Sequence, residues 1–267
     1  MVTRIISGVI AAAILIAVVL VDNNFIFNLA ATILSLIGLH EFYSAVKNKG
    51  VKPVEIIGYI TPLILLGIGY ISSNAMLFTI MLCVAGMIIA LFISSIITKI
   101  KYNVIDIAVT ALGVLYITYM FSFLVQINQM KFGYYYIWYV FLGAWMTDIF
   151  DYLVGVTIGK HKFSTISPKK SIEGCIGGVI GCVVSFIGYT LFLNSVGLEL
   201  NYIVMGALGV IVSVISQIGD FAASSIKRYC EIKDFGKIMP GHGGVLDRFD
   251  SILFISPLLY AFFVFIC

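Results

Sequence analysis

Charge is the scarcest property of this sequence: 11% of its 267 residues are Asp, Glu, Lys or Arg, and 61% are hydrophobic. Soluble domains have about a quarter charged and about half apolar residues. The mean hydropathy of +1.10 points the same way. A folded chain with so few polar side chains cannot cover itself with a water-soluble surface, so we set aside the soluble globular class.

Cysteine is also sparse, and its five positions show no paired metal-ligand spacing, which predicts neither a disulfide framework nor a zinc site. The net charge is only +3. Basic loops that lie beside anionic lipid headgroups account for a charge of this sign, and we expect no nucleic-acid partner.

Long apolar runs are abundant, and each is roughly the 17–25 residues that a helix needs to cross the hydrocarbon. The alternation of a transmembrane barrel strand is absent, and helices then satisfy the backbone in lipid. The sequence therefore predicts an all-α, polytopic integral membrane protein with about nine spans, near residues 5–21, 25–42, 55–72, 75–98, 104–127, 134–150, 174–195, 201–223 and 251–267.

The basic residues predict the orientation of these spans. With nine spans, 15 of the 16 Lys and Arg residues fall on one side, and only Lys131 falls on the other. Basic loops face the cytoplasm, so we expect a cytoplasmic N-terminus. The first run could instead be a signal peptide with Arg4 as its positive region. Its apolar stretch is longer than usual and no small-x-small cleavage site follows, so we expect a retained helix.

Polar residues concentrate in two inner loops, 159–173 and 224–250. We therefore predict one membrane domain, with an N-terminal helical scaffold over 1–130 and a catalytic region over 131–267. Ser167-Pro168 in the first loop precedes Lys169 and Lys170 at the expected start of a helix, which is a plausible anion site. Ordinary cytoplasmic lysines explain this pair equally well.

Acidic residues also occur at the ends of two spans. Asp148 and Asp151 are three residues apart and share one helical face. Asp220 follows nearly twenty uncharged residues. A carboxylate at membrane depth is costly and indicates function, such as cation binding. The alternatives are that the first pair lies at the headgroups and that Asp220 forms a structural ion pair.

The stretch "KIMPGHGGVLDRFD", residues 237–250, is the most polar part of the chain. Pro240 and three glycines disfavour regular helix and let the backbone approach a ligand. His242, Asp247, Arg248 and Asp250 accompany them. Backbone N–H groups suit phosphate oxygens and carboxylates suit a hard cation, so this combination predicts a phosphate-and-metal loop.

The longer segment "SSIKRYCEIKDFGKIMPGHGGVLDRFDS", residues 224–251, resembles the signature of phosphatidate cytidylyltransferases, also called CDP-diacylglycerol synthases. Motif similarity extends over roughly 148–251. Departures include Asp151 where the family has Ala, and Ala223 where it often has Glu. The matching positions are Ser225 (or Ser224), Lys227, Arg228, Lys233, Asp234, Gly236, Pro240, His242, Gly243, Gly244, Asp247, Arg248 and Asp250.

This resemblance implies that CTP and phosphatidic acid give CDP-diacylglycerol and pyrophosphate, with Mg²⁺ and room for a second cation. It also implies a homodimer in the bacterial inner membrane, with the active site facing the cytoplasm. Asp220 and Asp247 would hold the metal, supported by Asp250 and Asp148, and would act in catalysis with Lys227 and Arg248. Substrate binding would involve Ser167, Lys169, Lys170, Arg228, Lys233, His242, Gly243 and Gly244.

Two other functions fit part of the pattern. A CTP-dependent kinase acting on a lipid alcohol would share the membrane setting and the metal, but it needs a general base near the hydroxyl. A cation-coupled transporter would use the intramembrane Asp148 and Asp220. Transport would leave the glycine-rich loop without a role.

Overall fold

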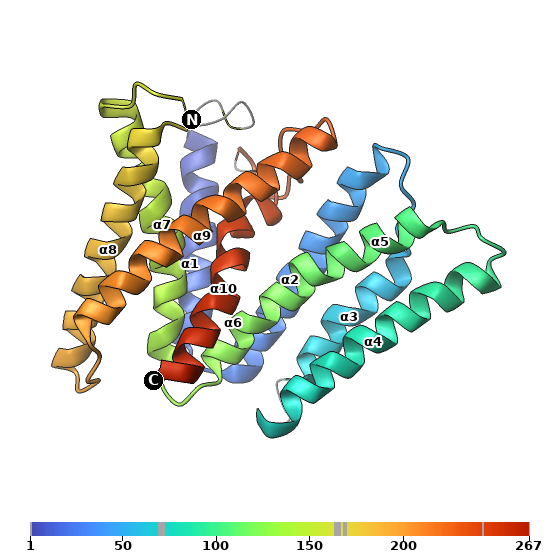
Figure 1. Ribbon diagram of the computed structural model, residues 1–267, viewed down its shortest axis with the longest axis horizontal. Helices are drawn as coiled ribbons and strands as arrows, with labels where there is room; N and C mark the ends of the chain where they lie inside the picture. The colour runs from blue at the N-terminus through green and yellow to red at the C-terminus, as the bar shows by residue number, and fades with distance from the viewer. Residues whose placement is uncertain (1, 69–72, 163–166, 168–169, 242, 267) are drawn as a thin grey trace. The chain divides into compact units, whose positions relative to one another are not determined.

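The computed structural model describes every residue except 1, 69–72, 163–166, 168–169, 242 and 267. The described chain forms helices and no strand beyond isolated bridges (Figure 1), which confirms the predicted all-α class. The helices are α1 (Val2–Leu20), α2 (Asn24–Lys47), α3 (Glu55–Ile68), α4 (Ser73–Ile97), α5 (Val104–Gly113), α6 (Met120–Asn128), α7 (Gly133–Thr157), α8 (Ile172–Ser195), α9 (Tyr202–Tyr229) and α10 (Leu246–Ile266).

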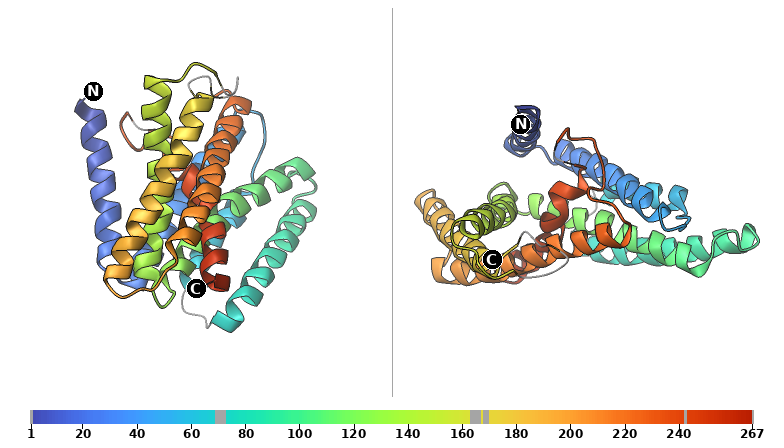
Figure 2. Two further views of the ribbon diagram at one scale, coloured as in Figure 1. Left: turned by 60° about the vertical axis from the view of Figure 1, so that its left-hand side comes forward. Right: turned by 90° about the horizontal axis from the view of Figure 1, so that it is seen from above.

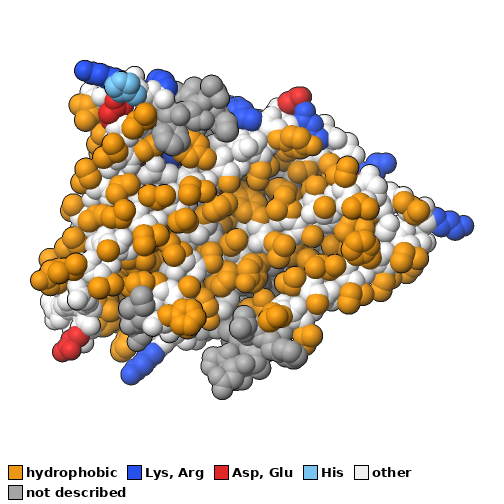
Figure 3. Space-filling model, in the orientation of Figure 1, with side chains coloured by type: hydrophobic (Ala, Val, Ile, Leu, Met, Phe, Trp, Pro, Cys, Tyr) orange, Lys and Arg blue, Asp and Glu red, His pale blue; other side chains and the backbone are white. Residues whose placement is uncertain are grey.

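Seven helical stretches of the described chain are long and apolar enough to cross a membrane. They lie in α2, α4, the continuous stretch from α5 to α6, and α7 to α10. The two remaining predicted spans coincide with α1 and α3, whose apolar parts are shorter, Ile6–Leu20 and Glu55–Ile64. The face of the molecule in Figure 3 is largely hydrophobic. These features are those of an integral membrane protein.

Local sequence signals explain several helix boundaries. The Asn23 side chain caps α2 by accepting hydrogen bonds from Phe25 N and Ile26 N. Asn103 and Asp106 form a reciprocal capping box at the start of α5. The Ser171 side chain accepts a hydrogen bond from Gly174 N at the start of α8. Each cap satisfies N–H groups that the first helical turn leaves without a backbone partner.

The chain forms two compact units. The first unit comprises residues 1–129 and 229–248, and the second comprises 130–228 and 249–267. In the first unit α2 packs against α1, α3, α5 and α6. The segment between α9 and α10, residues 230–245, also belongs to this unit, and we call it the glycine loop. The division of roles between 1–130 and 131–267 stays a prediction.

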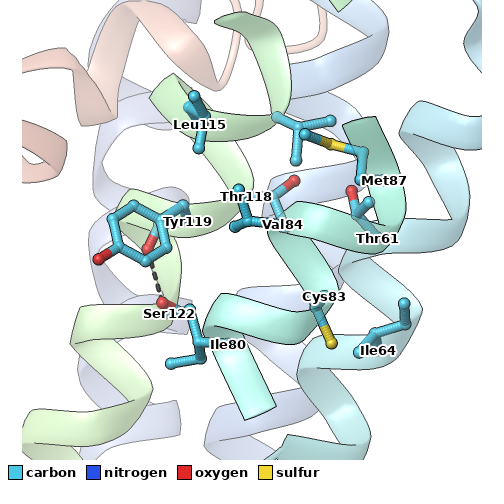
Figure 4. Close-up of a pocket in the computed structure, with 11 residues that line it drawn as sticks. Thr61, Ile64, Ile80, Cys83, Val84, Met87, Leu115, Thr118, Tyr119 and Ser122 are labelled. Atoms are coloured by element: carbon cyan, nitrogen blue, oxygen red, sulfur yellow. Dashed lines mark hydrogen bonds between the residues drawn. The ribbon is translucent and has the colours of Figure 1, made fainter. Parts of the chain in front are cut away.

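A π-helical stretch, Val114–Tyr119, joins α5 to α6 in the first unit. Its residues line a small pocket together with side chains of α3, α4 and α6 (Figure 4). The cavity measures about 50 Å³. Ligand pockets for drug-sized molecules are usually about 300–1,000 Å³, so this cavity is too small for a nucleotide.

In the second unit α7 and α8 run side by side (Figures 1 and 2). Glycines on α8 permit this approach: a Cβ atom at Gly178 would lie 2.9 Å from Thr147 O, and one at Gly181 would overlap the Phe150 ring. Small residues let helix backbones pack closely within a membrane. The packing brings the start of α8 next to Asp151, near the end of α7.

Candidate active site

A lysine whose side chain is only 13% exposed organises the polar end of the second unit. Lys170 Nζ lies 2.6 Å from Asp220 Oδ2 and 3.3 Å from Asp151 Oδ2. The same atom lies 5.1 Å from the centre of the Phe221 ring. Burial alone would lower the pKa of Lys170, but the charge of Asp220, followed by that of Asp151, raises this pKa above the ordinary value. Lys170 is therefore a fixed cation between two carboxylates.

A third carboxylate, Asp250, comes from α10. Helices α9 and α10 touch at Gly219, where a Cβ atom would lie 2.9 Å from Asp250 O. The Asp250 side chain is buried, and its Oδ1 accepts a hydrogen bond from Ser251 N at 2.9 Å. Asp250 is within electrostatic reach of Asp220, Lys227 and Asp148. The second unit thus brings Lys170 within electrostatic reach of Asp148 and Asp220, and the same two carboxylates within reach of Asp250.

The donor chemistry of this cluster suits Mg²⁺. Among the described residues, no three His, Cys, Asp or Glu side chains converge on one point. Mg²⁺ does not require such a cage, because it usually binds one or two carboxylates and completes its shell with water and substrate phosphates. Asp220 and Asp250, on touching helices, can supply these oxygens.

The glycine loop of the first unit folds around another carboxylate. Asp247 Oδ2 accepts hydrogen bonds from Phe235 N at 2.8 Å and from Gly244 N at 2.9 Å. Gly243 has a φ of +89°, which favours glycine. In this structure the N–H of Gly244 donates to Asp247, so this hydrogen bond holds the loop conformation. The metal-binding role of Asp247 stays a prediction.

The other predicted residues are distributed as follows. Ser167 and Lys227 are half-buried in the second unit, where Arg228 is exposed. Lys233 and Arg248 are exposed in the first unit. Exposed cations of this kind are accessible to anionic ligands. Lys169 and His242 lie outside the described residues.

Sequence reasoning missed one residue that holds the glycine loop. Glu41, on α2, is 3% exposed and accepts hydrogen bonds from Val245 N at 3.0 Å and Leu246 N at 2.8 Å. The sequence assigns this helix to the scaffold because the polar residues concentrate in the loops of the C-terminal half, and the backbone groups that Glu41 binds lie about two hundred positions away. The available signal was an acidic residue inside an apolar run, which is the rule that pointed to Asp220.

Comparison with known proteins agrees with this chemistry. The model of the cytidylyltransferase family matches residues 2–266. A phosphatidate cytidylyltransferase of Bacillus subtilis is 34% identical over 268 residues, which cover 96% of this chain and 95% of that protein. A phosphatidate cytidylyltransferase of Staphylococcus aureus is 32% identical over 242 residues, or 90% of this chain and 91% of that protein. The chain therefore belongs to the cytidylyltransferase family.

Proposed function

We propose that this protein transfers the cytidylyl group of CTP to phosphatidic acid, giving CDP-diacylglycerol and pyrophosphate. The observation that carries the proposal is full-length similarity to proteins named phosphatidate cytidylyltransferase. The carboxylates and lysines of the second unit supply a chemistry that fits. An integral membrane protein also gives a lipid substrate direct access from the bilayer.

The reaction exchanges one phosphate linkage for another. An oxygen of the lipid phosphate attacks the α-phosphorus of CTP, and the bond from that phosphorus to the bridging oxygen breaks. The electron pair leaves with pyrophosphate. The second pKa of a phosphate monoester is about 6, so the nucleophile is mostly ionised at pH 7 and needs no strong general base. The protein's task is to position two anions and neutralise their charge.

Mg²⁺ is the cofactor we propose, with Asp220 and Asp250 as its principal ligands and Asp148 in support. Asp247 remains a predicted ligand within its own unit. When bound, the metal would neutralise phosphate charge. A second cation stays part of the prediction.

The basic side chains would neutralise the remaining negative charge of the two phosphate substrates. Lys170 is held by carboxylates on two sides, so its ammonium is fixed before an anion arrives. Such preorganisation avoids reorganisation as the transition state forms. Lys227 is held nearby, and Arg228, Lys233 and Arg248 would bind phosphate oxygens of CTP or the lipid.

The membrane arrangement follows from the same proposal. We propose that all nine helical stretches cross the bilayer, with the N-terminus in the cytoplasm, because this places 15 of 16 basic residues on one side. The relatives from Bacillus subtilis and Staphylococcus aureus are bacterial proteins, which favours the bacterial inner membrane. The active site would then face cytoplasmic CTP. A homodimer is proposed from the family resemblance alone.

The choice of acceptor tests the function. Purified protein in detergent would receive radiolabelled CTP, Mg²⁺ and either phosphatidic acid or a polyprenol, and lipid products would be separated. CDP-diacylglycerol from phosphatidic acid, with no phosphorylated polyprenol, supports the proposal. Phosphorylated polyprenol without CDP-diacylglycerol would replace it with the kinase alternative. Glu199→Gln, in the loop between α8 and α9, serves as the control variant and should retain activity.

A further inference from the structure

Glu41 joins α2 to the point where the glycine loop becomes α10. Its Oε1 accepts a hydrogen bond from Val245 N and its Oε2 accepts one from Leu246 N. The N–H groups at the start of a helix have no partner within that helix. Here a carboxylate from a distant helix of the same unit supplies that partner.

Two carboxylates hold three consecutive N–H groups of this segment. Asp247 takes the N–H of Gly244, and Glu41 takes those of Val245 and Leu246. Asp247 also binds Phe235 N, on the opposite side of the loop. Hydrogen bonds to ionised acceptors are roughly twice as strong as neutral ones, so the two carboxylates together define the path of the loop.

The glycines of the loop leave space for Glu41. A Cβ atom at Gly236 or at Gly244 would overlap the Glu41 carboxylate. Neither glycine has a left-handed φ, in contrast to Gly243 at +89°. Close approach of Glu41 therefore explains why glycine occupies positions 236 and 244.

We propose that Glu41 is a positioning residue, which fixes the glycine loop in the conformation that binds the phosphates of CTP. This inference rests on the proposed function for the identity of the nucleotide. Glu41 does not touch the substrate; it acts through the backbone of Gly244, Val245 and Leu246. A helix assigned to the scaffold thereby controls nucleotide affinity.

Two substitutions separate charge from volume. Glu41→Gln keeps the shape, but its NH₂ group cannot accept from an N–H, so one of the two hydrogen bonds is lost. Glu41→Ala leaves both buried N–H groups without an acceptor. We expect the dissociation constant of CTP to rise about tenfold for Gln and further for Ala. The KM for phosphatidic acid should change less than about twofold, as should kcat at saturating CTP.

A double-mutant cycle tests the contact itself. Gly244→Ala should weaken CTP binding in the wild-type background, because the methyl group collides with Glu41. In the Glu41→Ala background the collision disappears, and Gly244→Ala should cause little further loss. Gly243→Ala is the matched control, because its backbone strain persists whichever residue stands at position 41. Its effect should be the same in both backgrounds.

CTP binding would be measured by equilibrium dialysis with radiolabelled CTP, beside the thermal unfolding of each variant in detergent. This readout needs no turnover, so it tests Glu41 even if wild-type protein transfers nothing to phosphatidic acid. Weaker CTP binding by folded Glu41→Gln, together with coupling to Gly244→Ala, supports the proposal. Unchanged CTP affinity in the Glu41 variants, or equal Gly244→Ala effects in both backgrounds, overturns it.

An exposed attachment of the loop provides a further control. Glu231 pairs with Lys49, just after the end of α2, at 2.6 Å, but the Glu231 side chain is 80% exposed. Exposed ion pairs contribute little to stability. Glu231→Gln should therefore leave CTP affinity within about twofold of wild type. A loss as large as that of Glu41→Gln would show that any disturbance of the loop weakens binding, and would overturn the specific role of Glu41.

Discussion

Lys170 Nζ lies 2.6 Å from Asp220 Oδ2, so a residue that precedes α8 is paired with one in the second half of α9. Asp151 of α7 contacts the same ammonium. Two helices of the second unit, α7 and α9, and the segment that precedes α8 therefore meet through one cation. This arrangement explains how a chain with so few charges concentrates them where phosphate chemistry would need them.

Removing Lys170 should lower the stability of the protein. Lys170→Met leaves Asp151 and Asp220 without their shared counter-ion, and breaking a buried pair typically costs about 3–5 kcal/mol. Asp220 is 29% exposed, so we expect a cost of about 2–3 kcal/mol after solvent screening. Denaturant unfolding in mixed micelles measures it. An unchanged free energy of unfolding would contradict the pairing.

Asp151 is the carboxylate whose role the sequence left open. The Asp151 side chain is 8% exposed and shares Lys170 with Asp220. The Asp151→Ala substitution should therefore remove one of the two carboxylates that hold the Lys170 ammonium in place. We expect kcat/KM for phosphatidic acid to fall about tenfold, which corresponds to about 1.4 kcal/mol. Steady-state kinetics would show this loss. In the Lys170→Met background, the Asp151→Ala substitution should have a much smaller effect, and equal effects in both backgrounds would refute the coupling.

The pH dependence of stability follows from the raised pKa of Lys170. A lysine whose folded pKa exceeds its unfolded pKa contributes stability fully below the unfolded value and loses it as pH rises through the folded value. Lys170 should thus stay charged over pH 6–9 and contribute no slope there. Denaturant unfolding at neutral and at strongly alkaline pH checks it: the stability that Lys170 contributes should be present at neutral pH and lost only above the ordinary lysine pKa of about 10.4.

The glycines of α8 predict a packing effect. Gly178→Ala places a methyl group 2.9 Å from Thr147 O, and the helices must separate to admit it. Overpacking of this kind costs about 1–3 kcal/mol. Gly188→Ala on the same helix meets no atom within 4 Å, and its better helix propensity should keep stability unchanged or raise it. Thermal unfolding should show a lower melting temperature for Gly178→Ala and an unchanged or higher one for Gly188→Ala.

Much of the fold could be predicted because apolar runs report helices directly. Each of the nine predicted spans overlaps a helical stretch of the described chain, and residues 69–72 and 267 of two of these spans lie outside the described residues. The π-helical stretch at Val114–Tyr119 could not be predicted, because its composition is that of any apolar helix. The observed ends of helices also differ from the predicted ends of spans. Helix α9 continues to Tyr229, beyond the predicted span 201–223, because polar residues extend the helix outside the apolar run.

The site was predicted only in part, for a physical reason. Motif spacing identified Asp220, Lys170 and Asp250 as site residues, and the structure brings them into one unit. Spacing does not reveal which side chains meet, so the pairing of Lys170 with Asp151 came only from the packing of α7 on α8. Glu41 was not predicted because its partners are backbone N–H groups, which every non-proline residue has and which therefore leave no mark in the sequence.

The most direct test of the central claim is the rate of CDP-diacylglycerol formation from CTP and phosphatidic acid as Mg²⁺ is titrated, for wild type and Asp220→Asn. The account predicts Mg²⁺-dependent product that EDTA abolishes in wild type. It also predicts a loss of at least about 100-fold for folded Asp220→Asn, since a proposed Mg²⁺ ligand would be gone. Equal rates for the two proteins, or product formation by wild type in EDTA, would contradict the account.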